Sequence, residues 1–383
     1  MNVSPRANSA GANALGTKWL KALYRGYTDA SFSQYSEQPP WQGTQGPTIR
    51  AEVGDLIEIM FVNKMTTNYA TMHSMGLEYS KYSEGADYPN NTMPGASNQL
   101  SPTNAVPPVQ AGVEPSGCVV YKWMVDPAAG PDASEPARTH SYHSYVSLEQ
   151  DSNAGLIGPS IVYPSGQMAK VMAEYREFPL LYMIYAESQS FLSGANAAAL
   201  HGSASQSDAS QSGANPQNNG NHGGPPSSAG APSGPPSTSA SAGSSANTAS
   251  FPPGNYSIYH PQLVNLGSAN QFQAPSFFTM NGYIFANNPA FEMCRDDKVI
   301  WYVNAYGSAS HVFHMHGNGF RYHGFNEYAI SLNDGVGKTL VMDAWGQGLW
   351  QVICHVGNHQ AMGMLLNYQV YGTGMCPLPS LGS

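Results

Sequence analysis

Apolar and polar residues alternate along short segments in both halves of the chain. In "TIRAEVGDLIEIMFVNK" (residues 48–64), two alternating runs flank Gly54 and Asp55, as in two strands joined by a tight turn. The C-terminal half holds further short runs that are rich in β-branched and aromatic residues: "KVIWYVNA", "KTLVMDA", "GLWQVICH" and "MLLNYQVYG". Short strands at this spacing are typical of a sandwich or a barrel. Residues 166–176 suggest one short helix.

The alternation stops over residues 193–250, which are mostly Ser, Gly, Pro and Ala. This segment has one charged residue, Asp208, no aromatic residue and one large aliphatic residue, Leu200. It cannot bury enough apolar surface to offset the entropy of ordering, so we predict a disordered spacer. The predicted division is a first domain at residues 17–185, a low-complexity insert at 186–255 and a second domain at 256–374.

The two predicted domains share a weak sequence echo. "RAEVGDLIEIMFVN" in the first resembles "EMCRDDKVIWYVN" in the second. We therefore expect an all-β chain that uses one type of β-sandwich twice.

Charge narrows the function classes. Charged residues make up 10% of the 383 residues, with 15 basic and 24 acidic side chains and a net charge of −9; a typical soluble domain has about 25%. Such a chain lacks the basic surface that grips phosphate backbones, so nucleic-acid binding is excluded. No apolar run approaches the ~18 residues of a membrane span. The N-terminal "MNVSPRANSAGANALG" shows no apolar core of a signal peptide.

Most of the 12 histidines gather in three motifs. Side chains alternate between the faces of a strand, so His311 and Cys354 are expected inside the second sandwich. The residues of opposite parity, His314, His316 and His355, are expected together on its outer face. The motifs are "SHVFHMHGNGF" with His311, His314 and His316, "VICHVGNHQAMGML" with Cys354, His355, His359 and Met364, and "THSYHSY" with His140 and His143, while His73 lies alone in "ATMHSMGLEY".

A thiolate, two imidazoles and a weak thioether define a blue-copper site. Cys354 is followed by His359 and Met364 at +5 and +10, with Gly357 and Gly363 to shape the loop, and His311 completes the set. Zinc would not select the thioether, although the outer histidines alone would also suit a catalytic zinc. The simplest alternative is that these side chains only fill a core.

The peptide between Cys354 and His355 connects two sites. Cys354 belongs to the predicted blue-copper site, and His355 faces the group on the outer surface. Electrons can therefore pass between the two sites through covalent bonds.

These motifs resemble the multicopper oxidases, most closely the ceruloplasmin and hephaestin branch. The resemblance covers residues 18–185 and 276–372 in order, and its segments include "KALYRGYTD", "GPTIRAEVGD", "MHSMGLEYSKYSEGADYPNNT", "YHSYVSLEQDSNAGLIGPSIVYP" and "TMNGYIFANNPAFEMCRDDKVIWYV". It implies two cupredoxin domains. It also assigns type 1 copper to His311, Cys354, His359 and Met364.

The resemblance implies an incomplete three-copper oxygen site. Type 2 copper would be held by His73 and His314, and the remnant of the type 3 pair by His143, His316 and His355. Met75, Tyr145 and Ile353 stand where the family has its other three histidines. Isoleucine offers no lone pair and a neutral phenol is a weak ligand. We therefore do not expect full four-electron reduction of dioxygen.

The electron donor implied by the resemblance is a small organic reductant or Fe²⁺. The family's ferroxidase members use acidic residues near type 1 copper. Here that position is Asn358, and the stretch "YGSAS" before His311 has no carboxylate. Iron oxidation is therefore not favoured over organic reductants.

Compartment and assembly also follow from the resemblance. Cys294 and Cys376 stand where the family has a disulfide, which favours secretion despite the missing signal. The family's first strand has no counterpart before Thr17, so we expect a shortened N-terminus. In the family the oxygen site joins the first domain to the last, and a two-domain chain restores that junction as a cyclic homotrimer.

The sequence is compatible with three functions. The first is a copper-dependent oxidoreductase that collects electrons at type 1 copper and passes them to a reduced interface site. The second is a blue-copper electron-transfer or copper-binding protein without dioxygen reduction. The third is a non-catalytic cupredoxin scaffold.

Overall fold

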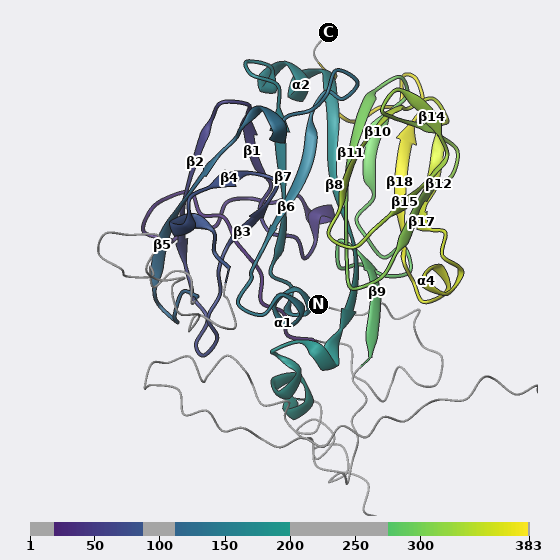
Figure 1. Ribbon diagram of the computed structural model, residues 1–383. Coiled ribbons are helices and arrows are strands. Elements are labelled where there is room, and N and C mark those ends of the chain that lie inside the picture. Colours follow the sequence, from purple (N-terminus) through teal and green to yellow (C-terminus); the bar gives the residue numbers. More distant parts are fainter. Residues whose placement is uncertain (1–18, 87–111, 200–274, 382–383) are drawn as a thin grey trace, which may run out of the picture.

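Two β-sandwiches lie side by side in the computed structural model, which describes residues 19–86, 112–199 and 275–381 (Figure 1). The first sandwich pairs a four-stranded sheet with a three-stranded sheet. The four-stranded sheet has the order β1 (Ile49–Glu52), β7 (Ile157–Tyr163), β6 (Arg138–His143) and β3 (His73–Met75). The three-stranded sheet has the order β2 (Leu56–Val62), β5 (Cys118–Met124) and β4 (Glu78–Tyr79).

The second sandwich has larger sheets, and it contains β12 and β17. Its five-stranded sheet has the order β10 (Phe291–Cys294), β18 (Leu365–Tyr371), β17 (Gly348–Cys354), β12 (His311–Met315) and β15 (Ala329–Leu332). Its six-stranded sheet has the order β14 (Phe325–Glu327), β13 (Phe320–Tyr322), β16 (Gly337–Asp343), β11 (Lys298–Tyr306), β8 (Tyr175–Ala186) and β9 (Ser276–Met280).

Helices are short and lie at the ends of the sandwiches. The α-helices include α1 (Leu148–Ala154), α2 (Met168–Glu174) and α4 (Gly357–Ala361), residues 193–199 are also helical, and the 3-10 turns include η3 (Pro40–Gln42), η4 (Lys81–Ser83), η6 (Pro127–Ala129) and η7 (Glu187–Gln189). The predicted helix at 166–176 is confirmed by α2, and the predicted turn at Gly54 by β1 and β2 on either side of it. The all-β prediction with two cupredoxin-like sandwiches is confirmed. No helix among the described residues is long and apolar enough to cross a membrane.

Strand β8 belongs to the sheet of the second sandwich. It pairs in parallel with β11, from Tyr175 opposite Lys298 onward, and antiparallel with β9. The boundary predicted from the sequence, at residue 185, assigns this strand to the first domain. Strand pairing instead places β8 in the second sandwich, so the boundary between the two sandwiches lies near residue 175. The low-complexity insert then falls between two neighbouring strands of one sheet. Its residues 200–255 lie outside the described residues, as do residues 256–274 of the predicted second domain.

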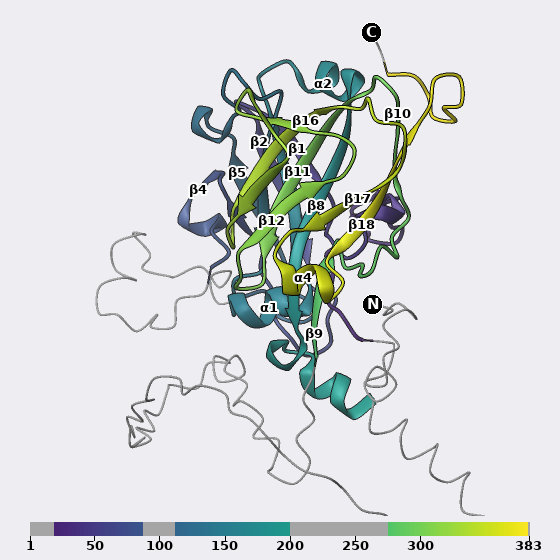
Figure 2. The same ribbon diagram turned by 90° about the vertical axis from the view of Figure 1, so that its right-hand side faces the viewer.

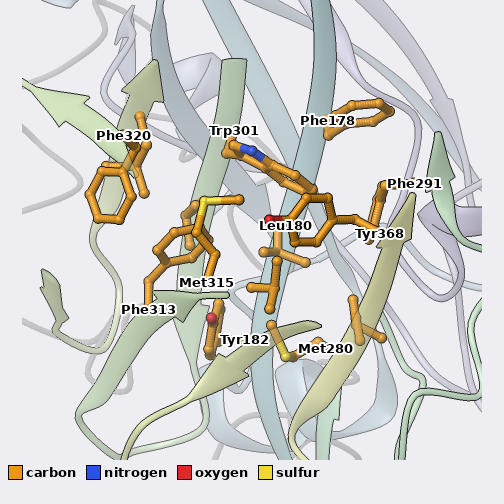
Figure 3. Close-up of a cluster of buried hydrophobic side chains, with 14 of the residues drawn as sticks. Phe178, Leu180, Tyr182, Met280, Phe291, Trp301, Phe313, Met315, Phe320 and Tyr368 are labelled. Carbon is orange, nitrogen blue, oxygen red and sulfur yellow. The ribbon is translucent and has the colours of Figure 1, made fainter. Parts of the chain in front are cut away.

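Strands β8 and β11 are buried on both faces, which explains their continuous apolar sequences. One face, with Leu180 and Trp301, packs into the core of the second sandwich (Figure 3). The other face meets the first sandwich, where Tyr302 packs with Tyr163 of β7, and Met183 with Ile157. The two sandwiches are therefore joined by an apolar interface.

The predicted disulfide between Cys294 and Cys376 is confirmed. It ties the end of β10 to the C-terminal segment. The two remaining cysteines are free: Cys118 is exposed on β5 and Cys354 is buried on β17.

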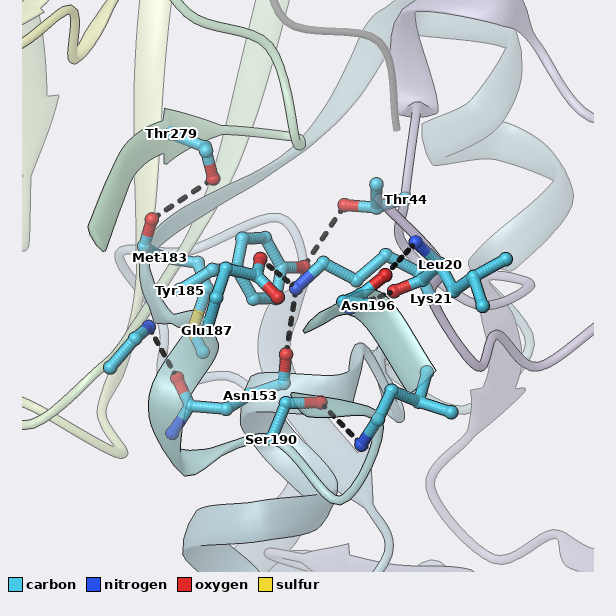
Figure 4. Close-up of polar contacts among 12 residues, drawn as sticks. Leu20, Lys21, Thr44, Asn153, Met183, Tyr185, Glu187, Ser190, Asn196 and Thr279 are labelled. Carbon is cyan, nitrogen blue, oxygen red and sulfur yellow. Dashed lines mark hydrogen bonds and ion pairs between the residues drawn. The ribbon is translucent and has the colours of Figure 1, made fainter. Parts of the chain in front are cut away.

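A buried ion pair holds the N-terminal segment against the junction of the sandwiches (Figure 4). The Lys21 ammonium contacts the Glu187 carboxylate, donates to the Asn153 carbonyl at 2.8 Å and lies 4.0 Å from the centre of the Tyr185 ring. Its side chain is 2% exposed and that of Glu187 is fully buried. Burial lowers the pKa of Lys21 and raises that of Glu187, while each partner's charge opposes that change. Each charge therefore depends on the other.

Removing one member of this pair is expected to cost more stability than removing both. Glu187→Leu leaves a buried ammonium uncompensated, which costs about 3–5 kcal/mol, whereas Lys21→Met with Glu187→Leu restores most of that loss. Urea unfolding of both variants and the parent tests this. A single variant as stable as the double variant would show that the pair is well solvated instead.

Candidate metal centre

Three side chains that can bind a metal meet inside the second sandwich. His311 begins β12, Cys354 ends β17, and the two strands are neighbours, with Phe313 opposite Cys354. His359 enters from α4, at one end of these strands (Figure 2). His311 and Cys354 are fully buried and His359 is 6% exposed. The predicted inward parity of His311 and Cys354 is confirmed.

The spacing of the three ligand atoms suits one metal ion. Cys354 Sγ lies 3.7 Å from His311 Nδ1 and 3.5 Å from His359 Nδ1. With metal–nitrogen bonds of about 2.0 Å, metal–thiolate bonds of about 2.3 Å and angles of about 110–120°, bound nitrogen and sulfur atoms lie about 3.5–3.7 Å apart. The gap between these atoms therefore fits a metal ion without movement of the strands.

Met364 is joined by its backbone to two members of this cluster, which we call the Cys354 cluster (His311, Cys354, His359). Its side chain is fully buried. Its backbone is held at both ends, since the Cys354 amide donates to the Met364 carbonyl and the Met364 amide donates to the His359 carbonyl, each at 3.0 Å. Gly363 shapes the loop with a φ of 110° and leaves no space for a side chain, because a Cβ there would lie 2.8 Å from the Phe285 ring.

Burial controls the protonation of the Cys354 cluster. It raises the pKa of the Cys354 thiol. It lowers the pKa of His311 to about 4, with His359 as a second cause, and it lowers the pKa of His359. Both imidazoles are therefore neutral at pH 7 and free to bind, while the thiol gives up its proton only when a metal replaces it.

The opposite face of the same strands carries a second group, which we call the outer group (His314, His316, His355). The His314 ring centroid lies 5.3 Å from those of His316 and His355. His316 and His355 are exposed. Nδ1 of His314 donates to the Tyr328 carbonyl at 2.7 Å, which leaves Nε2 as the metal-binding atom. The predicted outward parity is confirmed.

Ile353 lies within the outer group. It is opposite His314 in the pairing of β12 with β17 and is 7% exposed. Its parity is that of His355, so its side chain shares the outer face. The outer group therefore has three imidazoles and an aliphatic side chain where a fourth ligand would fit.

A third group, the first-sandwich group (His73, His143, Tyr145), lies on β3, at the end of β6 and just after it. His73 and His143 are opposite each other in register, with ring centroids 5.4 Å apart. Tyr145 lies 5.2 Å from His73 and 5.6 Å from His143. Nδ1 of His73 donates to the Glu84 carbonyl at 2.6 Å and Nδ1 of His143 to that of Ser144 at 2.9 Å, so both leave Nε2 free. Met75 follows His73 on the same face of β3 and is 37% exposed.

The first-sandwich group and the outer group stay apart within one copy of the chain. Among the described residues, no ring contact joins a member of one group to a member of the other. The two groups could therefore combine only across a junction between two copies of the chain.

One cluster of polar side chains was missed by sequence reasoning. His323, which had no partner in the sequence pattern, lies 2.9 Å from Asp132 and 4.0 Å from Glu135. Arg138 pairs with the same two carboxylates. Because a cation already occupies these acids, the cluster is an ion network between the two sandwiches. His323 is about 190 residues from the other three members in sequence, so no local spacing signals its place in the network.

Comparison with known proteins places these sites in context. Residues 255–373 match a family model described as multicopper oxidase. The chain is 26% identical over 367 residues to ferroxidase HEPHL1 of Homo sapiens, 26% over 373 residues to hephaestin of Homo sapiens, and 26% over 366 residues to ceruloplasmin of Rattus norvegicus. These matches cover 94%, 95% and 94% of the chain, but 26%, 26% and 28% of the relatives. The chain thus spans about a quarter of the length of the curated relatives it matches.

A solved structure shows the same fold. The copper nitrite reductase of Nitrosomonas europaea matches with a TM-score of 0.51 and 12% identity, and the match covers 95% of each chain.

Proposed function

Because the chain belongs to the multicopper oxidase family, we propose that it is a copper-dependent oxidoreductase that takes single electrons from a small reductant. The Cys354 cluster with Met364 is the electron-collecting type 1 site. Cys354 and His355 then lead to a second site, smaller than the three-copper site of the family. Bound copper supplies one-electron chemistry by alternating between Cu(I) and Cu(II).

The observation that carries this proposal is the buried Cys354 cluster. A thiolate and two neutral imidazoles at metal-ligand spacing, together with the thioether of the buried Met364, whose backbone bonds to Cys354 and His359, form the donor set of blue copper rather than of zinc. Cys354 and Met364 belong to the apolar core of the second sandwich, where polar groups such as the two imidazoles are costly unless they have a partner, which a bound metal would supply.

Cys354 and His355, at the end of β17, provide the path by which electrons leave the core. Cys354 faces inward and His355, one peptide further, faces outward beside His314. The His355 amide also donates to the Val312 carbonyl of β12 at 2.9 Å, which fixes this peptide between two strands. The path from thiolate to imidazole is therefore short, covalent and rigid.

The second site is proposed at a junction between copies. Each copy carries two incomplete groups on different sandwiches: the outer group, and the first-sandwich group. Head-to-tail contacts that bring the outer group of one copy to the first-sandwich group of the next would close as a cyclic homotrimer. His73 and His314 would hold type 2 copper, and His143, His316 and His355 the remnant of the type 3 pair. The capacity of this site to reduce dioxygen is lowered, because three of the family's histidines are replaced by Met75, Tyr145 and Ile353.

The electron donor is proposed to be a small organic molecule, with Fe²⁺ as the second choice. His359 follows Asn358, and no carboxylate precedes His311 within "YGSAS". A hard cation such as Fe²⁺ needs oxygen anions as ligands. The confirmed disulfide favours an oxidising compartment, so we propose an extracellular location.

A bleaching experiment tests this function. Hydroquinone added without air to the copper-loaded protein is expected to remove the visible colour, and air is expected to restore it, because the second site hands the electrons to dioxygen. His355→Ala should bleach equally but recover its colour at least about tenfold more slowly, since the path out is cut. His323→Gln, which changes an exposed histidine outside the three groups, is the control. Parent protein that bleaches but stays colourless in air would indicate an electron-transfer protein instead.

A further inference from the structure

Tyr182 of β8 packs against His311 of the Cys354 cluster, although nothing in its sequence context distinguishes it. Figure 3 shows its side chain in the core of the second sandwich. Its side chain is fully buried. Its ring centroid is 5.5 Å from that of His311 and 6.4 Å from that of Phe313. It is thus a phenol inserted into an otherwise apolar wall of the predicted copper site.

The Tyr182 hydroxyl begins a chain of hydrogen bonds that reaches Met364. It donates to the Ile353 carbonyl at 3.1 Å. That carbonyl belongs to the same peptide group as the Cys354 amide, which donates to the Met364 carbonyl at 3.0 Å. The chain therefore links β8, the backbone of Cys354 and the loop that presents the thioether.

Two physical effects make this chain relevant to a metal held by Cys354. Hydrogen bonds in series polarise one another, so a bond accepted by a peptide carbonyl strengthens the bond donated by its amide. The phenol is also fixed as the donor, because its partner, the Ile353 carbonyl oxygen, can only accept.

We propose that Tyr182 is a positioning residue of the copper centre, which fixes Cys354 and Met364 through the Ile353 carbonyl and thereby sets the reduction potential. This inference rests on the proposed type 1 site. It adds a residue that binds no metal and makes the potential depend on β8, a strand of the opposite sheet.

Tyr182→Phe is expected to keep copper but to raise the reduction potential. The ligands stay in place, so binding is retained. Loss of the hydroxyl makes the surroundings less polar, which favours the less charged Cu(I)–thiolate over Cu(II)–thiolate. A buried hydrogen bond contributes about 0.5–1.5 kcal/mol. The equilibrium constant for reduction should therefore rise about two- to tenfold, and tenfold corresponds to about 59 mV for one electron.

The experiment compares Tyr182→Phe with Tyr185→Phe. Tyr185 lies on the same strand, is equally buried, and also loses one hydrogen bond, to Thr44 at 3.1 Å, but points to the other face. Redox titration against mediator dyes gives the potential, and the visible spectrum reports the thiolate. Tyr182→Phe should shift both, while Tyr185→Phe should leave both at the parent values.

A copper-free readout separates this inference from the proposed function. Hydrogen–deuterium exchange of a peptide containing Cys354 should be about two- to tenfold faster in Tyr182→Phe than in Tyr185→Phe, because the Cys354 amide loses its support. A parent protein without blue copper would refute the proposed function and leave this exchange test standing. Equal exchange in the two variants, or an unchanged potential in Tyr182→Phe, would overturn the inference about Tyr182.

Discussion

Cys354→Ser is expected to abolish the visible absorption of the copper-loaded protein and to remove copper from the core. The colour comes from charge transfer between thiolate and Cu(II), and a serine hydroxyl is neither soft nor ionised at neutral pH. The two remaining imidazoles, His311 and His359, bind alone and far more weakly, so we expect a loss of copper affinity of at least about 100-fold. Titration of the metal-free protein with copper, followed by absorption and by metal analysis after dialysis, measures both effects.

Cys118→Ser is the matched control for that experiment. Cys118 is the other free cysteine, but it is exposed on β5 in the first sandwich. Its replacement should leave colour and copper content unchanged. If Cys354→Ser kept the absorption of the parent, the assignment of the Cys354 cluster to blue copper would be wrong.

The second large effect is complementation between two copies that each lack one half of the interface site. One variant carries His73→Ala and His143→Ala, and the other carries His314→Ala and His316→Ala. Each variant alone should lose the copper of the interface. When trimers assemble at random from equal amounts of the two variants, each junction joins one of four ordered pairs of neighbours. Only one of these pairs brings an intact outer group to an intact first-sandwich group, so about a quarter of the interface copper should return.

The Cys354 cluster is intact in both variants, so the visible absorption provides an internal standard for copper at type 1. Different affinity tags on the two variants isolate the mixed trimers, in which one of the three junctions is complete, so about a third of the interface copper should return in that fraction. Mixed oligomers that recover no interface copper would show that the two groups do not meet between copies. Parent-level interface copper in either variant alone would show that one group suffices.

Strand periodicity was sufficient to predict much of the site. The alternation of faces along β12 and β17 separated His311 and Cys354 from the outer histidines, because a strand has a period of two and the flanking residues are apolar. The spacing of His359 and Met364 after Cys354 predicted the loop, whose glycine at 363 has the expected backbone freedom.

Other features depend on contacts between distant strands and were out of reach of the sequence. β8 is buried on both faces, so its apolar run lacks alternation and does not show which sandwich it joins. The Tyr182 hydroxyl meets Ile353 across the core, and Lys21 meets Glu187 across 166 residues. No local pattern encodes such pairs, because tertiary packing alone brings them together.

Electron paramagnetic resonance of the copper-loaded parent protein, combined with metal analysis, tests whether Cys354 binds copper. We expect one copper per chain with the small hyperfine splitting of a Cu(II)–thiolate centre and intense visible absorption, together with further copper of ordinary tetragonal type. Copper that gives only the ordinary tetragonal signal and no colour would contradict this expectation, because Cys354 would then not be a ligand.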